Sequence, residues 1–114
     1  MKSLNLDEYS YNYLDEVKKD FENYLSDQKR IIKILERVKS NPLPNNEGGY
    51  GKPLGNKNNI NLTGCFKIKL NHPPIRIVYK LLREKKEMLI IAISDREDSE
   101  VYELASHRLS KHNL

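Results

Sequence analysis

The chain has 114 residues, of which 32% are charged, and its formal net charge at pH 7 is +4. Its length fits one domain of about 100–150 residues, and its one cysteine excludes an internal disulfide and any zinc site built from several cysteines. No run of about 18 apolar residues could cross a membrane, and the N-terminus lacks the apolar core of a signal peptide. The sequence therefore predicts one cytoplasmic domain, residues 9–114, preceded by an N-terminal extension, residues 1–8.

The first half of the domain is predicted to be one strand followed by two helices. Tyrosines alternate with small polar residues over 9–14, which is the two-residue period of a strand. Asp15 is then placed to cap a helix, and Ser26 or Asp27 to cap a second one with apolar residues at helical spacing. The second helix is expected to end at Asn41–Pro42. Because almost no chain separates the two helices, they are predicted to form an antiparallel hairpin.

The second half is predicted to be a loop, three strands and a short helix. Residues 41–63 contain three of the five prolines and four of the five glycines, which indicates a long, mobile loop. Cys65–Leu70 and Ile75–Leu82 are expected to be strands joined by a turn, and Met88–Ile93 a buried strand. Ser99 is expected to cap the last helix. The predicted fold class is α+β, with an antiparallel sheet in the order β-α-α-β-β-β-α and the helix hairpin packed on one face.

Basic residues gather in one part of the sequence. Residues 1–50 have 8 basic and 9 acidic side chains, whereas residues 51–114 have 12 and 7. Between residues 51 and 83 there are seven basic residues and no acidic one. Such a stretch attracts a polyanion such as nucleic acid, although a solvated basic face is the simpler interpretation of composition alone.

A four-residue turn at 71–74 would determine how the two strands of the predicted hairpin pair. It places Lys69 directly across from Arg76, with Lys67 on the same face of the sheet. The intervening apolar residues then point to the other face and into a core. A slip of one residue would bury the cations, so this register is strongly preferred. Arg96 reaches the basic surface only if the loop that follows the last strand folds back over the sheet.

The chemistry of such a cluster favours phosphate as its ligand. Three cations with no carboxylate partner repel one another, and bound phosphate would explain why they are held together. Crowding lowers the pKa of a lysine and makes a neutral amine available as a general base, while an arginine keeps its charge and suits a phosphorane transition state. RNA carries its own nucleophile in the 2′-hydroxyl, and the sequence shows no spacing typical of a metal site. These residues therefore favour RNA over DNA, with neither metal nor cofactor.

Three segments carry a recognisable pattern, in this order along the chain: Gly64–Leu70, Ile75–Lys80 and Ile93–Ala105. They resemble the RelE/ParE superfamily of bacterial toxins, and most closely its RelE-type messenger-RNA interferases. With the two-helix segment included, the similarity extends over roughly residues 9–110. The resemblance implies a small RelE-like fold and a toxin that cleaves messenger RNA on the ribosome and is neutralised by a cognate antitoxin protein. It implies no metal, no cofactor and no membrane partner.

The same resemblance implies roles for five residues. The implied catalytic residues are Lys67, Lys69, Arg76, Arg96 and Tyr102. By similarity, Lys69 is the preferred general base, and Lys67 is a phosphate ligand or a second candidate for the base. Arg76 matches the residue that stabilises the transition state, Arg96 the one that stabilises the leaving 5′-oxygen, and Tyr102 the one that stacks on the substrate base. Attack by the 2′-hydroxyl then leaves a 2′,3′-cyclic phosphate and a 5′-hydroxyl.

Two other functions fit the same fold. A ParE-like toxin would inhibit DNA gyrase by binding it, and a non-catalytic module would bind RNA or a protein partner. The presence of all five residues together favours the ribonuclease over both. The chain departs from the family pattern in two respects. Its loop at 41–63 is long, and Arg96 is flanked by the acidic residues Asp95, Glu97 and Asp98.

Overall fold

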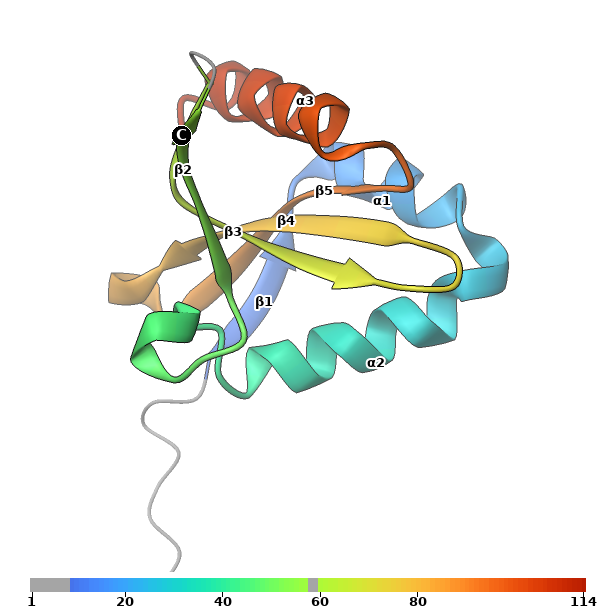
Figure 1. Ribbon diagram of the computed structural model, residues 1–114, viewed down its shortest axis with the longest axis horizontal. Coiled ribbons are helices and arrows are strands. Elements are labelled where there is room, and N and C mark those ends of the chain that lie inside the picture. Colours follow the sequence, from blue (N-terminus) through green and yellow to red (C-terminus); the bar gives the residue numbers. More distant parts are fainter. Residues whose placement is uncertain (1–8, 58–59) are drawn as a thin grey trace, which may run out of the picture.

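The chain folds into one five-stranded sheet with helices on both faces, seen in a computed structural model that describes residues 9–57 and 60–114 (Figure 1). The predicted extension, residues 1–8, lies outside the described residues. The strands are β1 (Ser10–Tyr13), β2 (Lys52–Lys57), β3 (Ile60–Leu70), β4 (Ile75–Leu82) and β5 (Glu87–Ser94), in the spatial order β1-β5-β4-β3-β2. The helices are α1 (Asp15–Glu22), α2 (Gln28–Lys39) and α3 (Asp98–Lys111). None of the helices in these described ranges is long and apolar enough to cross a membrane.

Different helices cover the two faces of the sheet, with α3 above it and α2 below it in Figure 1. On the α2 face, the rings of Phe66 and Tyr79 stack with their centres 5.4 Å apart, and the Tyr79 hydroxyl donates to the Pro42 carbonyl at 2.7 Å. On the other face, the amine of Lys67 lies 3.1 Å from the carboxylate of Asp98 at the start of α3. The alternation along β3 therefore separates an apolar face from a basic one.

The predicted strand and two helices of the first half are confirmed, but their caps are not. Asp15 is the first residue of α1, and the N-cap position belongs to Leu14, which makes no side-chain cap. Asp27 does occupy the N-cap position of α2, yet its carboxylate binds Arg30 at 2.7 Å instead of the helix backbone. A short 3₁₀ turn, Leu25–Asp27, joins the helices, and α2 then runs back across the sheet (Figure 1).

The prediction of a mobile loop over 41–63 is wrong. Its second part contains β2 and the start of β3, which pair antiparallel with a bulge between Pro53 and Gly55, so the sheet has five strands and not four. Its first part is an ordered turn in which the Gly51 amide donates to the Leu43 carbonyl at 3.0 Å. The composition misled because β2 is an edge strand. Edge strands pair on one side only and therefore accept proline, glycine and lysine.

Two further expectations need correction. The sheet was expected to be antiparallel throughout, but β1 pairs parallel with β5, with Tyr11 beside Met88. Nearly the whole domain lies between these two strands, which leaves ample chain for the crossover that a parallel pair requires. The last helix was expected to be short and capped by Ser99, but it has 14 residues, begins at Asp98 and has Glu97 at its N-cap.

A buried ion pair ties α3 to α1 and β5. The two terminal nitrogens of Arg108 donate to the two carboxylate oxygens of Asp20 at 2.6 and 2.9 Å. Arg108 also donates to the Ile91 carbonyl at 3.0 Å, and Asp20 accepts from the Ile93 amide at 3.0 Å. The two charged side chains are only 11% and 10% exposed. This pair therefore joins α3 to α1 and β5, alongside the apolar side chains Val101, Ala105 and Leu109 that α3 buries.

We expect Asp20→Ala to lower the free energy of unfolding by about 3–5 kcal/mol, because it leaves the buried Arg108 guanidinium without its counterion. Urea denaturation followed by circular dichroism would measure the loss. The double variant Asp20→Ala/Arg108→Met should recover part of it, since it removes both charges. A loss below about 1 kcal/mol would show instead that the pair behaves like an exposed one.

Candidate functional site

The hairpin of β3 and β4 has the predicted register. Lys69 lies directly opposite Arg76, and Lys67 lies two residues before Lys69 on the same face. The turn between the strands spans residues 71–74. Arg30 of α2 donates to two backbone carbonyls of this turn, at 2.6 and 3.4 Å, and so holds the tip of the hairpin against the helix.

Arg76 is largely buried, with 9% of its side chain exposed. Its Nε donates to a carboxylate oxygen of Asp98, and its Nη1 donates to the backbone carbonyl of Arg96 at 2.6 Å. Its Nη2 lies 3.8 Å from the carboxylate of Glu97. These acceptors come from the loop after β5 and from the first residue of α3, and together they hold the guanidinium in one orientation.

Lys67 is the second largely buried cation of this site, with 11% of its side chain exposed. Its Nζ lies 3.1 Å from Asp98 and 5.9 Å from the centre of the Tyr102 ring. Burial acts to lower the pKa of Lys67, but hydrogen bonding to Tyr102 and Asp98 outweighs burial and raises the pKa above its ordinary value. The amine of Lys67 is therefore protonated at neutral pH in this arrangement, whereas crowding had been expected to favour a neutral lysine.

Asp98 is the residue of this site that sequence reasoning missed. One of its carboxylate oxygens accepts from Arg76 and the other lies against Lys67, so the expectation that the cations have no carboxylate partner is wrong. Burial acts to raise the pKa of Asp98, but the pairs with Lys67 and Arg76 outweigh it and lower the pKa below its ordinary value. The available signal was an acidic residue directly before the predicted cap of the last helix, which in the sequence stands out only as a departure from the family pattern.

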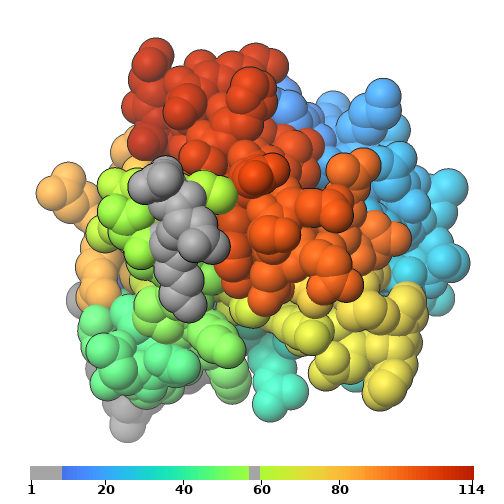
Figure 2. All heavy atoms as spheres, turned by 45° about the horizontal axis from the view of Figure 1, so that its top comes forward, coloured from blue at the N-terminus to red at the C-terminus, as the bar shows by residue number. Residues whose placement is uncertain are grey.

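Lys69 and Arg96 have exposed side chains. The loop before α3 does fold back over the sheet, because the Arg96 carbonyl meets Arg76, and Figure 2 shows the start of α3 (orange) against the hairpin (yellow). The Arg96 guanidinium turns to Glu100, 3.5 Å away. Tyr24 of the segment after α1 steadies this loop, since its hydroxyl accepts from the Asp95 amide at 2.9 Å and donates to the Asp95 carboxylate at 3.1 Å.

A basic groove continues from this site between α2, β3 and the segment before β2. Its volume is about 420 Å³, and its lining residues are Ile34, Arg37, Val38, Tyr50, Lys52, Lys67, Ile68 and Lys69. The guanidinium of Arg37 lies 5.4 Å from the centre of the Tyr50 ring, which is 48% exposed. Four of the eight lining residues are basic and none is acidic, so the groove offers a continuous positive path to a polyanion.

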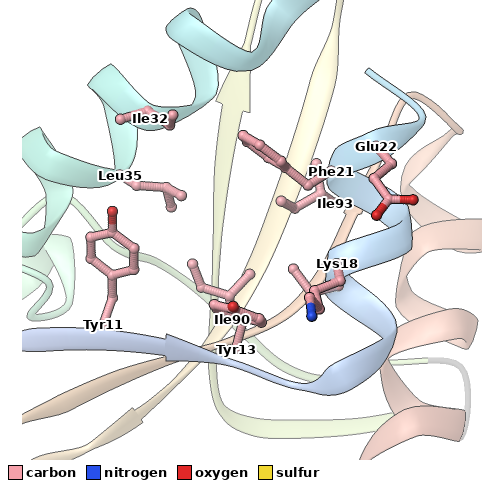
Figure 3. A pocket seen from close by; sticks show the side chains of 10 residues that line it. Tyr11, Tyr13, Lys18, Phe21, Glu22, Ile32, Leu35, Ile90 and Ile93 are labelled. Carbon is pink, nitrogen blue, oxygen red and sulfur yellow. The ribbon is translucent and has the colours of Figure 1, made fainter. Parts of the chain in front are cut away.

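A separate, largely apolar hollow of about 320 Å³ lies between β1, β5, α1 and α2. Side chains from all four elements point into it, among them Tyr11, Phe21, Leu35 and Ile90 (Figure 3). None of the five predicted site residues lines this hollow. Within the described ranges, no three or more histidine, cysteine, aspartate or glutamate side chains are grouped so that they could hold a metal ion.

Comparison with known proteins identifies relatives of the chain. No protein-family model matches it. The chain is 32% identical over 84 residues to the mRNA interferase toxin RelE of Escherichia coli strain K12, a match that covers 72% of this chain and 72% of that protein. A second E. coli protein, whose name calls it RelE-like, is 42% identical over 45 residues, a match that covers 40% of this chain and 47% of that protein.

Solved structures share the fold. A double mutant of the E. coli toxin RelE in the free state superposes with a TM-score of 0.67 and 24% identity, covering 89% of this chain and 97% of that one. A chain of the intact E. coli RelBE toxin–antitoxin complex superposes with a TM-score of 0.59 and 22% identity, covering 78% and 98% of the two chains. These superpositions confirm the predicted fold class.

We expect acetic anhydride to acetylate Lys67 several-fold more slowly than Lys69. The Lys67 amine is ion-paired and its side chain is only 11% exposed, whereas the Lys69 side chain is exposed. Mass spectrometry of peptides taken at successive times would give both rates. In concentrated urea the two rates should converge. Equal rates in the folded protein would contradict the ion-paired arrangement of Lys67.

Proposed function

Because this chain belongs to the RelE toxin family, we propose that it is the toxin of a type II toxin–antitoxin system and cleaves messenger RNA on the ribosome. The observation that carries this proposal is the convergence of Lys67 and Arg76 on the two oxygens of one carboxylate. The two non-bridging oxygens of a phosphodiester present a similar pair of acceptors, and lysine and arginine are the residues that bind them. The name of the E. coli relative, an mRNA interferase, supports messenger RNA as the source of that phosphate.

In the proposed reaction the RNA supplies its own nucleophile. The 2′-oxygen forms a bond to phosphorus and the bond from phosphorus to the 5′-oxygen breaks, which leaves a 2′,3′-cyclic phosphate and a 5′-hydroxyl. Lys69 accepts the proton of the 2′-hydroxyl when its amine is neutral, and the departing 5′-oxygen takes a proton from water. Arg76 and Lys67 stabilise the negative charge that builds up on the phosphorane, so the reaction needs no divalent metal.

Arg96 and Tyr102 complete the proposed site. Arg96 has a side chain that is 68% exposed and carries a permanent charge, which suits stabilisation of the leaving oxygen. Tyr102 is half-buried beside Lys67 and offers its ring to a substrate base. The basic groove with Arg37 and Tyr50 would hold neighbouring nucleotides through phosphate contacts and stacking.

The partners in this proposal are the ribosome, messenger RNA and a cognate antitoxin protein. The antitoxin is supported by the structural similarity to the E. coli RelBE toxin–antitoxin complex. The cations on the hairpin would attract an acidic antitoxin segment through the same field that attracts RNA. Neutralisation and cleavage would then compete for one surface.

We expect Arg76→Ala to lower the rate of messenger-RNA cleavage by roughly 10²–10³-fold, because it removes a preorganised charge from the transition state. The wild type, Arg76→Ala and Arg83→Ala would each be induced in bacterial cells, with growth followed and the ends of cut transcripts mapped. Arg83 is an exposed arginine directly after the far end of β4 that pairs with Glu47, so its variant controls for the loss of one positive charge. Circular dichroism would establish that each variant folds.

Cuts within translated messages that carry 5′-hydroxyl ends, lost in Arg76→Ala but not in Arg83→Ala, would support the proposal. Growth arrest with intact messages would overturn it and favour a toxin that inhibits DNA gyrase. Absence of arrest from folded wild-type protein would favour a module that binds RNA or a protein without catalysis.

A further inference from the structure

Asp98 places a negative charge at the point where the proposed function requires the phosphate of the substrate. One of its carboxylate oxygens accepts from Arg76 Nε, and the other lies 3.1 Å from Lys67 Nζ. We propose that this carboxylate substitutes for the substrate phosphate in the free protein, so that RNA must displace Asp98 in order to bind. This inference deepens the proposed function and rests on it for the identity of the ligand.

The position of Asp98 in the fold allows this displacement. Asp98 is the first residue of α3, follows Glu97 at the N-cap, and has a side chain that is 45% exposed. A rotation about its side-chain bonds would carry the carboxylate into solvent without unfolding the helix, and there it would remain near the positive end of the helix dipole. The rest of α3 is held by the Arg108–Asp20 pair, so the displacement is local.

The two cations keep other partners when Asp98 leaves. Arg76 retains its 2.6 Å hydrogen bond to the Arg96 carbonyl, and Glu97 lies 3.8 Å from its Nη2. Lys67 retains the Tyr102 ring, 5.9 Å from its Nζ. The donors that the carboxylate vacates are therefore already oriented for another pair of oxygens.

Competition between carboxylate and phosphate would make Asp98 a determinant of specificity. A ligand with one phosphate gains too little from Lys67 and Arg76 to displace a carboxylate that is tethered beside them. A substrate held by many further contacts can supply the difference. Asp98 would thus disfavour the binding of free phosphate and of RNA that makes few other contacts. A strand that is already positioned against the protein could still bind.

The test compares binding of two uncleavable probes to the wild type, Asp98→Asn, Asp98→Ser and Glu103→Gln. The probes are inorganic phosphate, followed by NMR at the Arg76 Nε–H, and a 2′-O-methyl oligoribonucleotide, followed by fluorescence anisotropy. Asn and Ser remove the charge of Asp98, and both are accepted at the start of a helix. Glu103→Gln makes the same change in net charge at an exposed position of α3.

We expect Asp98→Asn and Asp98→Ser to bind both probes about three- to tenfold more tightly than the wild type. The probe then no longer has to break the partly exposed ion pairs of Asp98, and the strength of such pairs sets this range. Glu103→Gln should change the affinity by less than about twofold at the same ionic strength. Unchanged or weaker binding by folded Asp98→Asn and Asp98→Ser would overturn the proposal. Equal tightening in Glu103→Gln would also overturn it, because net charge alone would then explain the effect.

The probes separate this inference from the proposed function, because neither of them can be cleaved. Tighter binding by the Asp98 variants, with no cleavage of messenger RNA by any variant or by the wild type, would overturn the proposed ribonuclease activity. It would support the inference that a bound phosphate displaces the Asp98 carboxylate. Cleavage by the wild type with no gain in binding by the Asp98 variants would support the ribonuclease and overturn the proposal that Asp98 is displaced.

Discussion

The pairing of β3 with β4 is the constraint on which the rest of the site depends. It sets Lys69 opposite Arg76 on one face, and it sends Phe66 and Tyr79 to the other, where Tyr79 is fully buried. Each large apolar side chain buried in this way contributes about 1.5–3 kcal/mol, whereas repulsion between two cations near a surface is weaker and is screened by salt. Burial of the apolar face therefore imposes the cluster of cations on the opposite face, and any change of register would bury lysines.

The position of α3 converts that cluster into a site. Arg108 and Asp20 anchor the far half of the helix to α1 and β5 through a buried ion pair, while its first two turns bring Asp98 and Tyr102 over the cations. A helix held firmly at one end can present a side chain at the other with little freedom in its backbone. The first side chain of the helix, Asp98, lies at the edge of the packed structure and is 45% exposed, so its pairs with Lys67 and Arg76, and not surrounding packing, hold it in place.

The sequence was sufficient to predict the features that depend on local patterns. Alternation along β3 and β4, together with a four-residue turn between them, predicted the strands, their register and the shared face of Lys67, Lys69 and Arg76. The structure confirms these, and the catalytic roles of the site residues stay predictions. The edge strand β2 was missed because an edge needs no apolar pattern. The Asp98 contacts were missed because Asp98 lies 31 positions from Lys67 and 22 positions from Arg76 in the sequence. No local pattern identified Asp98 as the first residue of the last helix.

The contacts of Asp98 also bear on which of the two lysines is the general base in the proposed reaction. A base must spend part of its time neutral, and the pairing of Lys67 with Asp98 and Tyr102 raises its pKa. If a phosphate replaces the carboxylate, Lys67 exchanges one anion for another and remains protonated. In the proposed reaction, Lys67 is therefore suited to hold the substrate and stabilise charge. The proposal assigns the proton of the 2′-hydroxyl to Lys69, whose exposed side chain lies next along the same face.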